Sequence, residues 1–209
     1  MSHFFNCFLF GDLYINPRFF VIFGGMKEKI ILIGKAASGK DFFQKHLVSS
    51  GWIPLKQYTT RPKRPSEVGD EYHFVTEKEF DNIAHRLMSV QTFNGWKYGI
   101  DIEEALLSDV MIFSPANLFD MYKSLDVKKR KLITNSTIVY LDIDEETRRE
   151  RLSIRYIGGN EDDSLERRLK ADAKDFNVLD NINWEINPMG YVRLCNKNEV
   201  DDFLKKLLS

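Results

Sequence analysis

The chain has 209 residues and a mass of 24.5 kDa, and its 30 Lys and Arg against 31 Asp and Glu give a formal net charge of −1. This length indicates one domain with room for a small subdomain, and 43% hydrophobic with 29% charged residues argues against a disordered chain. The balanced charge gives no global case for a nucleic-acid or membrane partner, so any anion site must come from local clusters. Cys7 and Cys195 form neither a CxxC pair nor a disulfide framework, so we expect a cytoplasmic protein.

Residues 1–25 differ in composition from the rest, because seven of the 16 phenylalanines precede Met26. The longest apolar run there, residues 19–23, is far shorter than the ~20 residues of a membrane span. The absence of Lys or Arg before Arg18 is atypical of a signal peptide. Two interpretations stay open: translation begins at Met26, or residues 1–25 are an extension that packs on the body.

From Met26 onward, short apolar runs predict buried strands, and capping residues followed by helical spacing predict helices. In chain order we expect a strand at 29–33, a helix at 39–49, loop with short strands at 54–75, a helix from 76 to about 86, a hairpin of 88–93 and 96–100, strands at 110–113 and 137–141, helices from 144 to about 155 and from 163 to about 176, a strand at 184–186 and a helix at 198–208. Alternating strands and helices indicate an α/β fold with a parallel core sheet flanked by helices. The polar, hairpin-containing stretch 54–105 is interpreted as an insertion.

A phosphate-binding loop is predicted where the first strand ends and the first helix begins, because residues 34–40 match G-x-x-x-x-G-K in the context that this motif requires. Its small residues let backbone N–H groups converge on phosphate oxygens, and the helix N-terminus favours an anion. The alternative is a glycine-rich turn with an incidental lysine. The residues of the motif are Gly34, Lys35, Ala36, Ala37, Ser38, Gly39 and Lys40.

The position after this lysine, where Ser or Thr normally ligates Mg²⁺, is Asp41. A carboxylate is a hard oxygen ligand and can hold Mg²⁺. Asp41 is therefore either a metal ligand or only an acidic residue in the first turn of the helix.

A second anion site is predicted from three cations within four positions, Arg61, Lys63 and Arg64, next to Pro62. Guanidinium groups bind phosphate through two parallel hydrogen bonds, and a rigid loop would aim them. By contrast, the basic run at residues 128–131 is interpreted as a solvated loop rather than a nucleic-acid site.

These motifs together resemble the guanylate kinase family. The resemblance rests on the phosphate loop, on Tyr58-Thr59-Thr60-Arg61-Pro62-Lys63-Arg64, on Gly69-Asp70-Glu71-Tyr72-His73-Phe74-Val75 and on Tyr98-Gly99, and it extends from about Lys29 to Ser209. It implies a P-loop kinase fold with a core at 26–57 and 106–209, a mixed α/β subdomain that binds a nucleoside monophosphate at about 58–105, and a helical lid at about 151–170.

The resemblance also implies roles for individual residues. Arg61, Arg64, Tyr72 and Tyr98 would bind the monophosphate, Arg151, Arg155 and Arg168 would be lid arginines that act with Lys40, and Asn187 would lie near ATP. Two helices joined by Gly158 and Gly159 could close this lid. The alternative is that the arginines of both helices form only salt bridges with neighbouring glutamates.

Three departures affect the expected reading of guanine. The family's guanine-binding Glu aligns with Ser89, the hydroxyl residue after Tyr-Gly is Ile100, and an acidic motif is replaced by residues 113–117. Guanine bound without that Glu would leave buried N–H donors unpaired, which is costly. The residues expected to bind phosphate are retained, whereas those expected to read the base are altered.

The sequence therefore predicts a kinase that uses ATP and Mg²⁺ to phosphorylate a nucleoside monophosphate, with nucleotides as its partners and no nucleic acid or membrane. Two alternatives remain: a non-catalytic binding module of the same family, and a P-loop kinase for another phosphorylated small molecule. The sequence does not indicate the oligomeric state.

Overall fold

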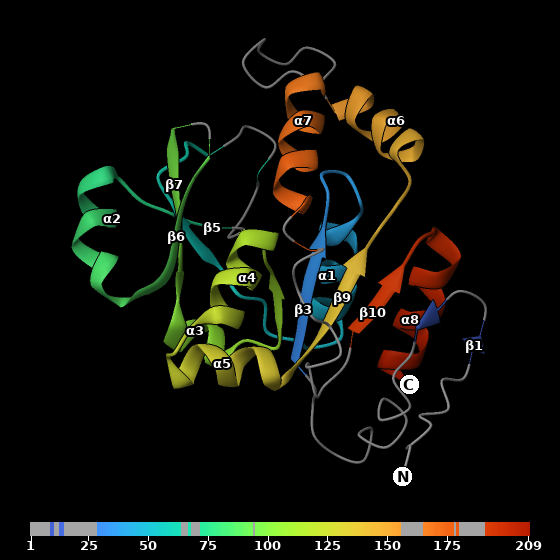
Figure 1. Cartoon of the computed structure of the whole chain (residues 1–209), viewed down its shortest axis with the longest axis horizontal. Helices are drawn as coiled ribbons and strands as arrows, with labels where there is room; N and C mark the ends of the chain where they lie inside the picture. Colours follow the sequence, from blue (N-terminus) through green and yellow to red (C-terminus); the bar gives the residue numbers. More distant parts are fainter. Residues whose placement is uncertain are drawn as a thin grey trace.

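The computed structural model of the chain describes residues 9–10, 13–14, 29–63, 67, 72–93, 95–155, 165–177, 179 and 191–209 (Figure 1). Its centre is a parallel sheet with the strand order β10-β9-β3-β8. The strands are β3 (Lys29–Gly34), β8 (Val110–Ile112), β9 (Ser136–Leu141) and β10 (Tyr191–Leu194). The predicted α/β fold with a parallel core sheet is confirmed.

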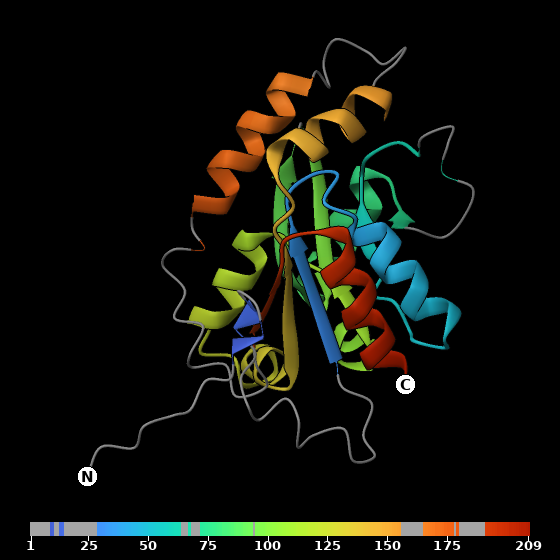
Figure 2. The same ribbon diagram turned by 90° about the vertical axis from the view of Figure 1, so that its right-hand side faces the viewer.

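Both faces of this sheet are buried, which explains why β3 is apolar at every position from Ile30 to Ile33. Ile30 and Leu32 pack in one cluster with α1 (Lys40–Ser49) and α8 (Lys197–Leu208), while Ile31 and Ile33 pack in another with α4 (Pro115–Lys123) and α5 (Val127–Thr134). Figure 2 shows α1 and α8 on one side of the sheet and α4 on the other.

A second sheet, with the order β5-β4-β7-β6, forms beside the core. Its strands are β4 (Gln57–Thr59), β5 (Tyr72–Phe74), β6 (Leu87–Phe93) and β7 (Trp96–Asp101), and the predicted hairpin pairs β6 with β7. The predicted capping box opens α2 (Glu77–Ile83), in which Thr76 and Glu79 cap each other, and residues 84–86 continue as a 3-10 turn. Phe80 of this helix packs on Gly99.

Two further helices, α6 (Glu145–Arg155) and α7 (Leu165–Phe176), stand over the carboxyl end of β3 (Figures 1 and 2). Asp144 begins α6 as predicted, because its carboxylate accepts a hydrogen bond from the Thr147 N–H. Leu152 of α6 and Leu169 of α7 bury Ala36 of the loop after β3. The two helices therefore hold this loop from one side.

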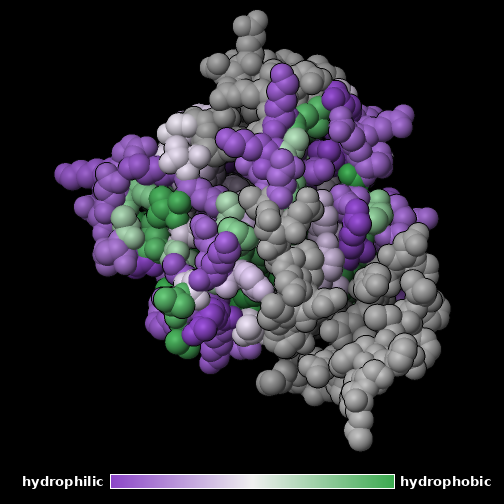
Figure 3. All heavy atoms as spheres, in the orientation of Figure 1, coloured by the Kyte–Doolittle hydropathy of each residue, from purple (hydrophilic) through white to green (hydrophobic). Residues whose placement is uncertain are grey.

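Several elements differ from the predictions. The helices α3 (Ile102–Leu107), α4 and α5 were not predicted, and residues 128–131 lie in α5 rather than in a loop. Asp126 caps α5, and the α5 residues Leu132 and Ile133 pack into the core. Figure 3 shows hydrophobic side chains among hydrophilic ones over α3 and α5. Leu107 of α3 is 76% exposed, and Leu125, in the loop before α5, is 89% exposed.

The ends of the chain add two findings. The last described strand, β10, lies after the strand predicted at 184–186, which is outside the described residues, as are Gly158 and Gly159. Short strands β1 (Leu9–Phe10) and β2 (Leu13–Tyr14) form an antiparallel pair near the N-terminus. Within the described residues, no helix is long and apolar enough to cross a membrane.

Candidate active site

The predicted phosphate loop, residues 34–40, leaves the carboxyl end of β3 and enters α1 through backbone conformations that its small residues allow. A Cβ atom on Gly34 would lie 2.9 Å from the Leu141 carbonyl oxygen and 2.5 Å from Ser38 Oγ, so only glycine fits there. Gly39 caps α1 at a φ of 101°, and Ala37 adopts a φ of 60°. The loop thus presents the N-terminus of a ten-residue helix to solvent, which suits an anion.

Lys40 lies over this loop in the first turn of α1. Its Nζ donates to the carbonyl oxygens of Gly34 at 2.5 Å and Lys35 at 3.0 Å. These contacts keep a cation at the mouth of the loop, within reach of any phosphate that the loop holds.

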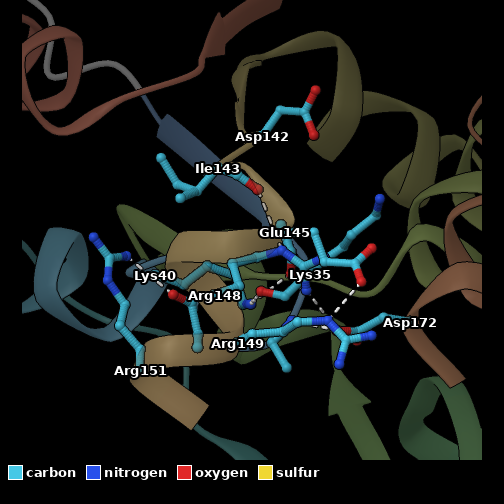
Figure 4. A network of polar contacts seen from close by, with 12 residues as sticks. Lys35, Lys40, Asp142, Ile143, Glu145, Arg148, Arg149, Arg151 and Asp172 are labelled. Carbon is cyan, nitrogen blue, oxygen red and sulfur yellow. Dashed lines mark hydrogen bonds and ion pairs between the residues drawn. The ribbon is translucent and has the colours of Figure 1, made fainter. Parts of the chain in front are cut away.

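Arg151 of α6 contacts the same loop. Its Nη1 donates to the Ala37 carbonyl oxygen at 3.0 Å, and it lies 3.9 Å from where a Cβ of Gly39 would be. In Figure 4, Arg151 and Lys40 lie on one side of a polar network that continues through Arg148 to Asp172. The structure thus brings together the lysine and one of the three predicted lid arginines.

A second cationic site lies on the other sheet, where β4 ends. Arg61 is 5% exposed, and its guanidinium lies 5.5 Å from the ring centroid of Tyr72 and 5.4 Å from that of Phe74. The centroid of Tyr98 is 6.2 Å from that of Tyr72. Pairing of Thr59 with both Phe74 and Tyr98 places these side chains on one face of the sheet.

In this structure the Arg61 guanidinium binds the Glu67 carboxylate with both of its outer nitrogens, at 2.6 and 3.1 Å. This is the geometry by which a guanidinium also binds two oxygens of a phosphate. The carboxylate of Glu67, for which no role was predicted, thus fixes the orientation of the Arg61 guanidinium.

The two sites influence each other electrostatically. Burial raises the pKa of Tyr72, and the neighbouring groups Tyr98 and Asp41 add to this rise. Asp41 belongs to the first turn of α1, whereas Tyr72 belongs to the second sheet. The charge of Asp41 therefore acts across the two sites. At neutral pH the Tyr72 hydroxyl is therefore a proton donor that lies near both the phosphate loop and Arg61.

A neutral polar network crosses from the second sheet to the core at the positions where the resemblance predicted base-reading residues. Asn117 Nδ2 donates to Ser89 Oγ at 2.7 Å, and Ser114 Oγ lies 2.9 Å from Gln91 Oε1 and 2.7 Å from Asn117 Oδ1. Ser89 and Asn117 are buried. Gln91 pairs directly with Tyr98, so the network continues the same face of the sheet as the Arg61 site.

Other predicted residues lie outside what the structure describes: Arg64 and Asn187 entirely, and Arg155 and Arg168 in their side chains. Of the alternative salt bridges, Arg149 does pair with Glu145 at 2.8 Å. The pair of Arg148 and Asp172 was not predicted, although a local signal exists. Arg148 lies four residues before the buried Leu152, and Asp172 lies three residues after the buried Leu169.

Comparison with known proteins agrees with this architecture. The family model described as guanylate kinase matches residues 26–207. A crystal structure of guanylate kinase from Anaplasma phagocytophilum is similar with a TM-score of 0.56 and 16% identity, over 87% of this chain and 85% of that one.

A structure of deoxyadenosine kinase from M. mycoides with bound dCTP gives a TM-score of 0.45 and 14% identity, over 86% of this chain and 98% of that one. No curated protein matches the sequence. The family match covers most of the chain, and the chain belongs to the guanylate kinase family.

Proposed function

We propose that the protein is an ATP-dependent nucleoside monophosphate kinase, which transfers the γ-phosphoryl group of MgATP to GMP, dGMP or a related (deoxy)nucleoside monophosphate. The observation that carries this proposal is the pair of candidate anion sites, near enough for Asp41 of one to act on Tyr72 of the other. The phosphate loop with Lys40 and Arg151 is suited to a triphosphate, and Arg61 with Tyr72 and Tyr98 is suited to a monophosphate. Transfer between two phosphates requires this arrangement, because catalysis consists mainly of positioning and charge stabilisation.

Each site residue has a role in this proposal. Backbone N–H groups within residues 34–41 hold the ATP phosphates, apart from those of Ala36 and Ser38, which donate to Asp172 and to the Lys35 carbonyl. In this proposal Asn187 lies nearby. Lys40 and the lid arginines 151, 155 and 168 stabilise charge on the transferred group. The side chains at 61, 64, 72 and 98 hold the acceptor phosphate, whose own oxygen is the nucleophile, so no protein base is needed.

Asp41 is the residue that would hold Mg²⁺. Its carboxylate is exposed at the first turn of α1, and within the described part of the chain no group of three His, Cys, Asp or Glu side chains forms a separate metal site. A Mg²⁺ ion at Asp41 would take its other ligands from phosphate and water, as Mg²⁺ commonly does. Bound there, the metal supplies neutralisation of phosphate charge.

The domain limits belong to the same proposal. Residues 58–105 form the subdomain that binds the monophosphate, residues 26–57 and 106–209 form the core, and residues 151–170 form the lid. The second sheet with α2 and the helices α6 and α7 support these limits.

The neutral network at Ser89, Gln91, Ser114 and Asn117 favours a second candidate acceptor, a monophosphate whose base is not guanine. Guanine offers two adjacent N–H donors that a carboxylate satisfies well, whereas this network contains only hydroxyl and amide groups. An acceptor base with a different donor pattern would avoid leaving those donors unpaired.

An assay of ADP release with MgATP and GMP, dGMP, dTMP, AMP, CMP or UMP tests the proposal. We expect turnover with at least one monophosphate. In the variant Ser89→Glu, GMP turnover should rise relative to the other acceptors, because a carboxylate can accept from both guanine donors. Absence of turnover with every acceptor, in a protein that binds MgATP, would contradict the proposal.

A further inference from the structure

A largely buried ion pair links α6 and α7 beside the phosphate loop, and the proposed function does not use it. Arg148 Nη1 lies 3.3 Å from Asp172 Oδ2, and the two side chains are only 4% and 14% exposed. Arg148 Nε also donates to the Ile143 carbonyl oxygen at 3.2 Å. Burying two charges is costly, so such a pair is weak evidence for stability and invites a functional explanation.

The carboxylate of this pair also contacts the loop itself. The Ala36 N–H donates to Asp172 Oδ2 at 2.9 Å (Figure 4). One oxygen atom therefore accepts from both a loop amide and the Arg148 guanidinium. A charged acceptor forms a stronger bond to an amide than a neutral one.

The next residue of the loop is the one that needs holding. Ala37 has a φ of 60°, a left-handed conformation that a residue with a Cβ atom adopts only when its surroundings enforce it. Asp172 accepts from the N–H of the preceding residue, Ala36, and Arg151 donates to the carbonyl oxygen of Ala37 itself. The contacts from α7 and α6 thus bracket the strained residue on both sides.

Charge explains why Asp172 needs Arg148. A lone carboxylate in contact with the loop would repel the phosphates of ATP, and the repulsion would be large because the site is poorly solvated. Arg148 cancels that charge and still leaves the carboxylate oxygen as an acceptor.

We propose that Arg148 and Asp172 are a positioning pair: Asp172 fixes the phosphate loop in its anion-binding conformation, and Arg148 neutralises Asp172 so that ATP can bind. This inference rests on the proposed binding of ATP at the loop, but not on the identity of the acceptor.

Single substitutions separate this electrostatic role from a merely structural one. Arg148→Leu and Asp172→Asn each leave one buried charge unpaired, so both should lower the melting temperature. Their effects on nucleotide binding should differ in size and direction. Arg148→Leu leaves a negative charge and should weaken binding of a non-hydrolysable ATP analogue with Mg²⁺ by about tenfold or more, whereas Asp172→Asn leaves a positive charge and should bind at least as tightly as wild type.

Two double variants test the positioning of the loop without any unpaired charge, and they remain informative if a single variant does not fold. Arg148→Leu/Asp172→Asn keeps an oxygen acceptor for Ala36, and we expect affinity within about threefold of wild type. Arg148→Leu/Asp172→Leu has nearly the same size but no acceptor, and should bind about fivefold more weakly than the first. Arg149→Leu, which breaks an exposed pair at the next position, is the control and should leave affinity unchanged.

Calorimetric titration without any acceptor, together with melting curves, reads out all variants. Equal weakening by both single variants, or equal affinity of the two double variants, would overturn the positioning role. A wild-type protein that does not bind the analogue would overturn both this inference and the proposed function. Binding with the expected pattern but no transfer to any monophosphate would refute only the proposed function.

Discussion

Replacing Arg61 with lysine tests the acceptor site most sharply, because the substitution keeps the positive charge but removes the planar guanidinium group and its two parallel donors. In the structure the guanidinium holds both oxygens of the Glu67 carboxylate, at 2.6 and 3.1 Å. A lysine ammonium can form one such hydrogen bond well but cannot reproduce the parallel pair.

The size of the effect follows from one lost charge-assisted hydrogen bond. Such a bond contributes about 1.5–3 kcal/mol. Since Glu67 competes with the phosphate for Arg61, we expect the lower half of this range, which raises KM for the monophosphate by roughly 10–50-fold. The kcat at saturating acceptor should change much less, because the lost contact exists before and during transfer.

Steady-state kinetics at saturating MgATP measure this effect for whichever monophosphate the wild type uses. Lys78→Ala removes an exposed cation from α2 and should leave KM unchanged. An Arg61→Lys variant with wild-type melting behaviour and a KM within twofold of wild type would refute the assignment of Arg61 to the acceptor phosphate.

Three further predictions concern the loop, the second sheet and alkaline pH. Lys40→Ala should lower kcat by at least about 100-fold while the circular dichroism spectrum stays native, and near-normal turnover would refute its role. Gly99→Ala should destabilise the protein by about 1–3 kcal/mol in denaturant unfolding, since the new Cβ would lie 2.9 Å from Phe80 Cζ; an unchanged midpoint would contradict this packing. Burial raises the pKa of both Tyr140 and Tyr191, so above about pH 10 the unfolded chain loses phenol protons that the folded protein keeps, and stability should fall with rising pH. Replacing both tyrosines with phenylalanine should flatten this alkaline loss in unfolding curves recorded between about pH 9 and 11, and an identical slope would count against it.

The parts of the site that were predictable from sequence have local determinants. The phosphate loop is one continuous stretch in which spacing, small residues and flanking elements all agree, and the structure places it where the motif requires. Tyr72 and Tyr98 belong to separate strands, and Arg61 lies two residues after the end of a third. The family resemblance named all three, and strand register explains why they converge.

What could not be predicted depends on contacts between distant segments. Ser89 and Asn117 meet across the two sheets, and nothing near either residue indicates the other. Arg148 and Asp172 meet across two helices for the same reason. The helix α5 does have a local signal, the capping residue Asp126. Its run of basic residues is also typical of a solvated loop, which obscures that signal.

The helix α4 carried a local signal that went unused. Ser114 is followed by Pro115 in the first turn, and Asn117 completes a capping box with Ser114. The side chains that begin this helix, Ser114 and Asn117, also belong to the neutral network. Their role in folding therefore cannot be told apart from their proposed role in the site by sequence alone.

The central claim, phosphoryl transfer between two bound nucleotides, is tested most directly by following the labelled γ-phosphate of ATP. When the protein is mixed with MgATP and the monophosphate panel, the label should appear in a nucleoside diphosphate, and its appearance should require both Mg²⁺ and Lys40. Label found only in inorganic phosphate, or left in ATP with every acceptor, would contradict the account.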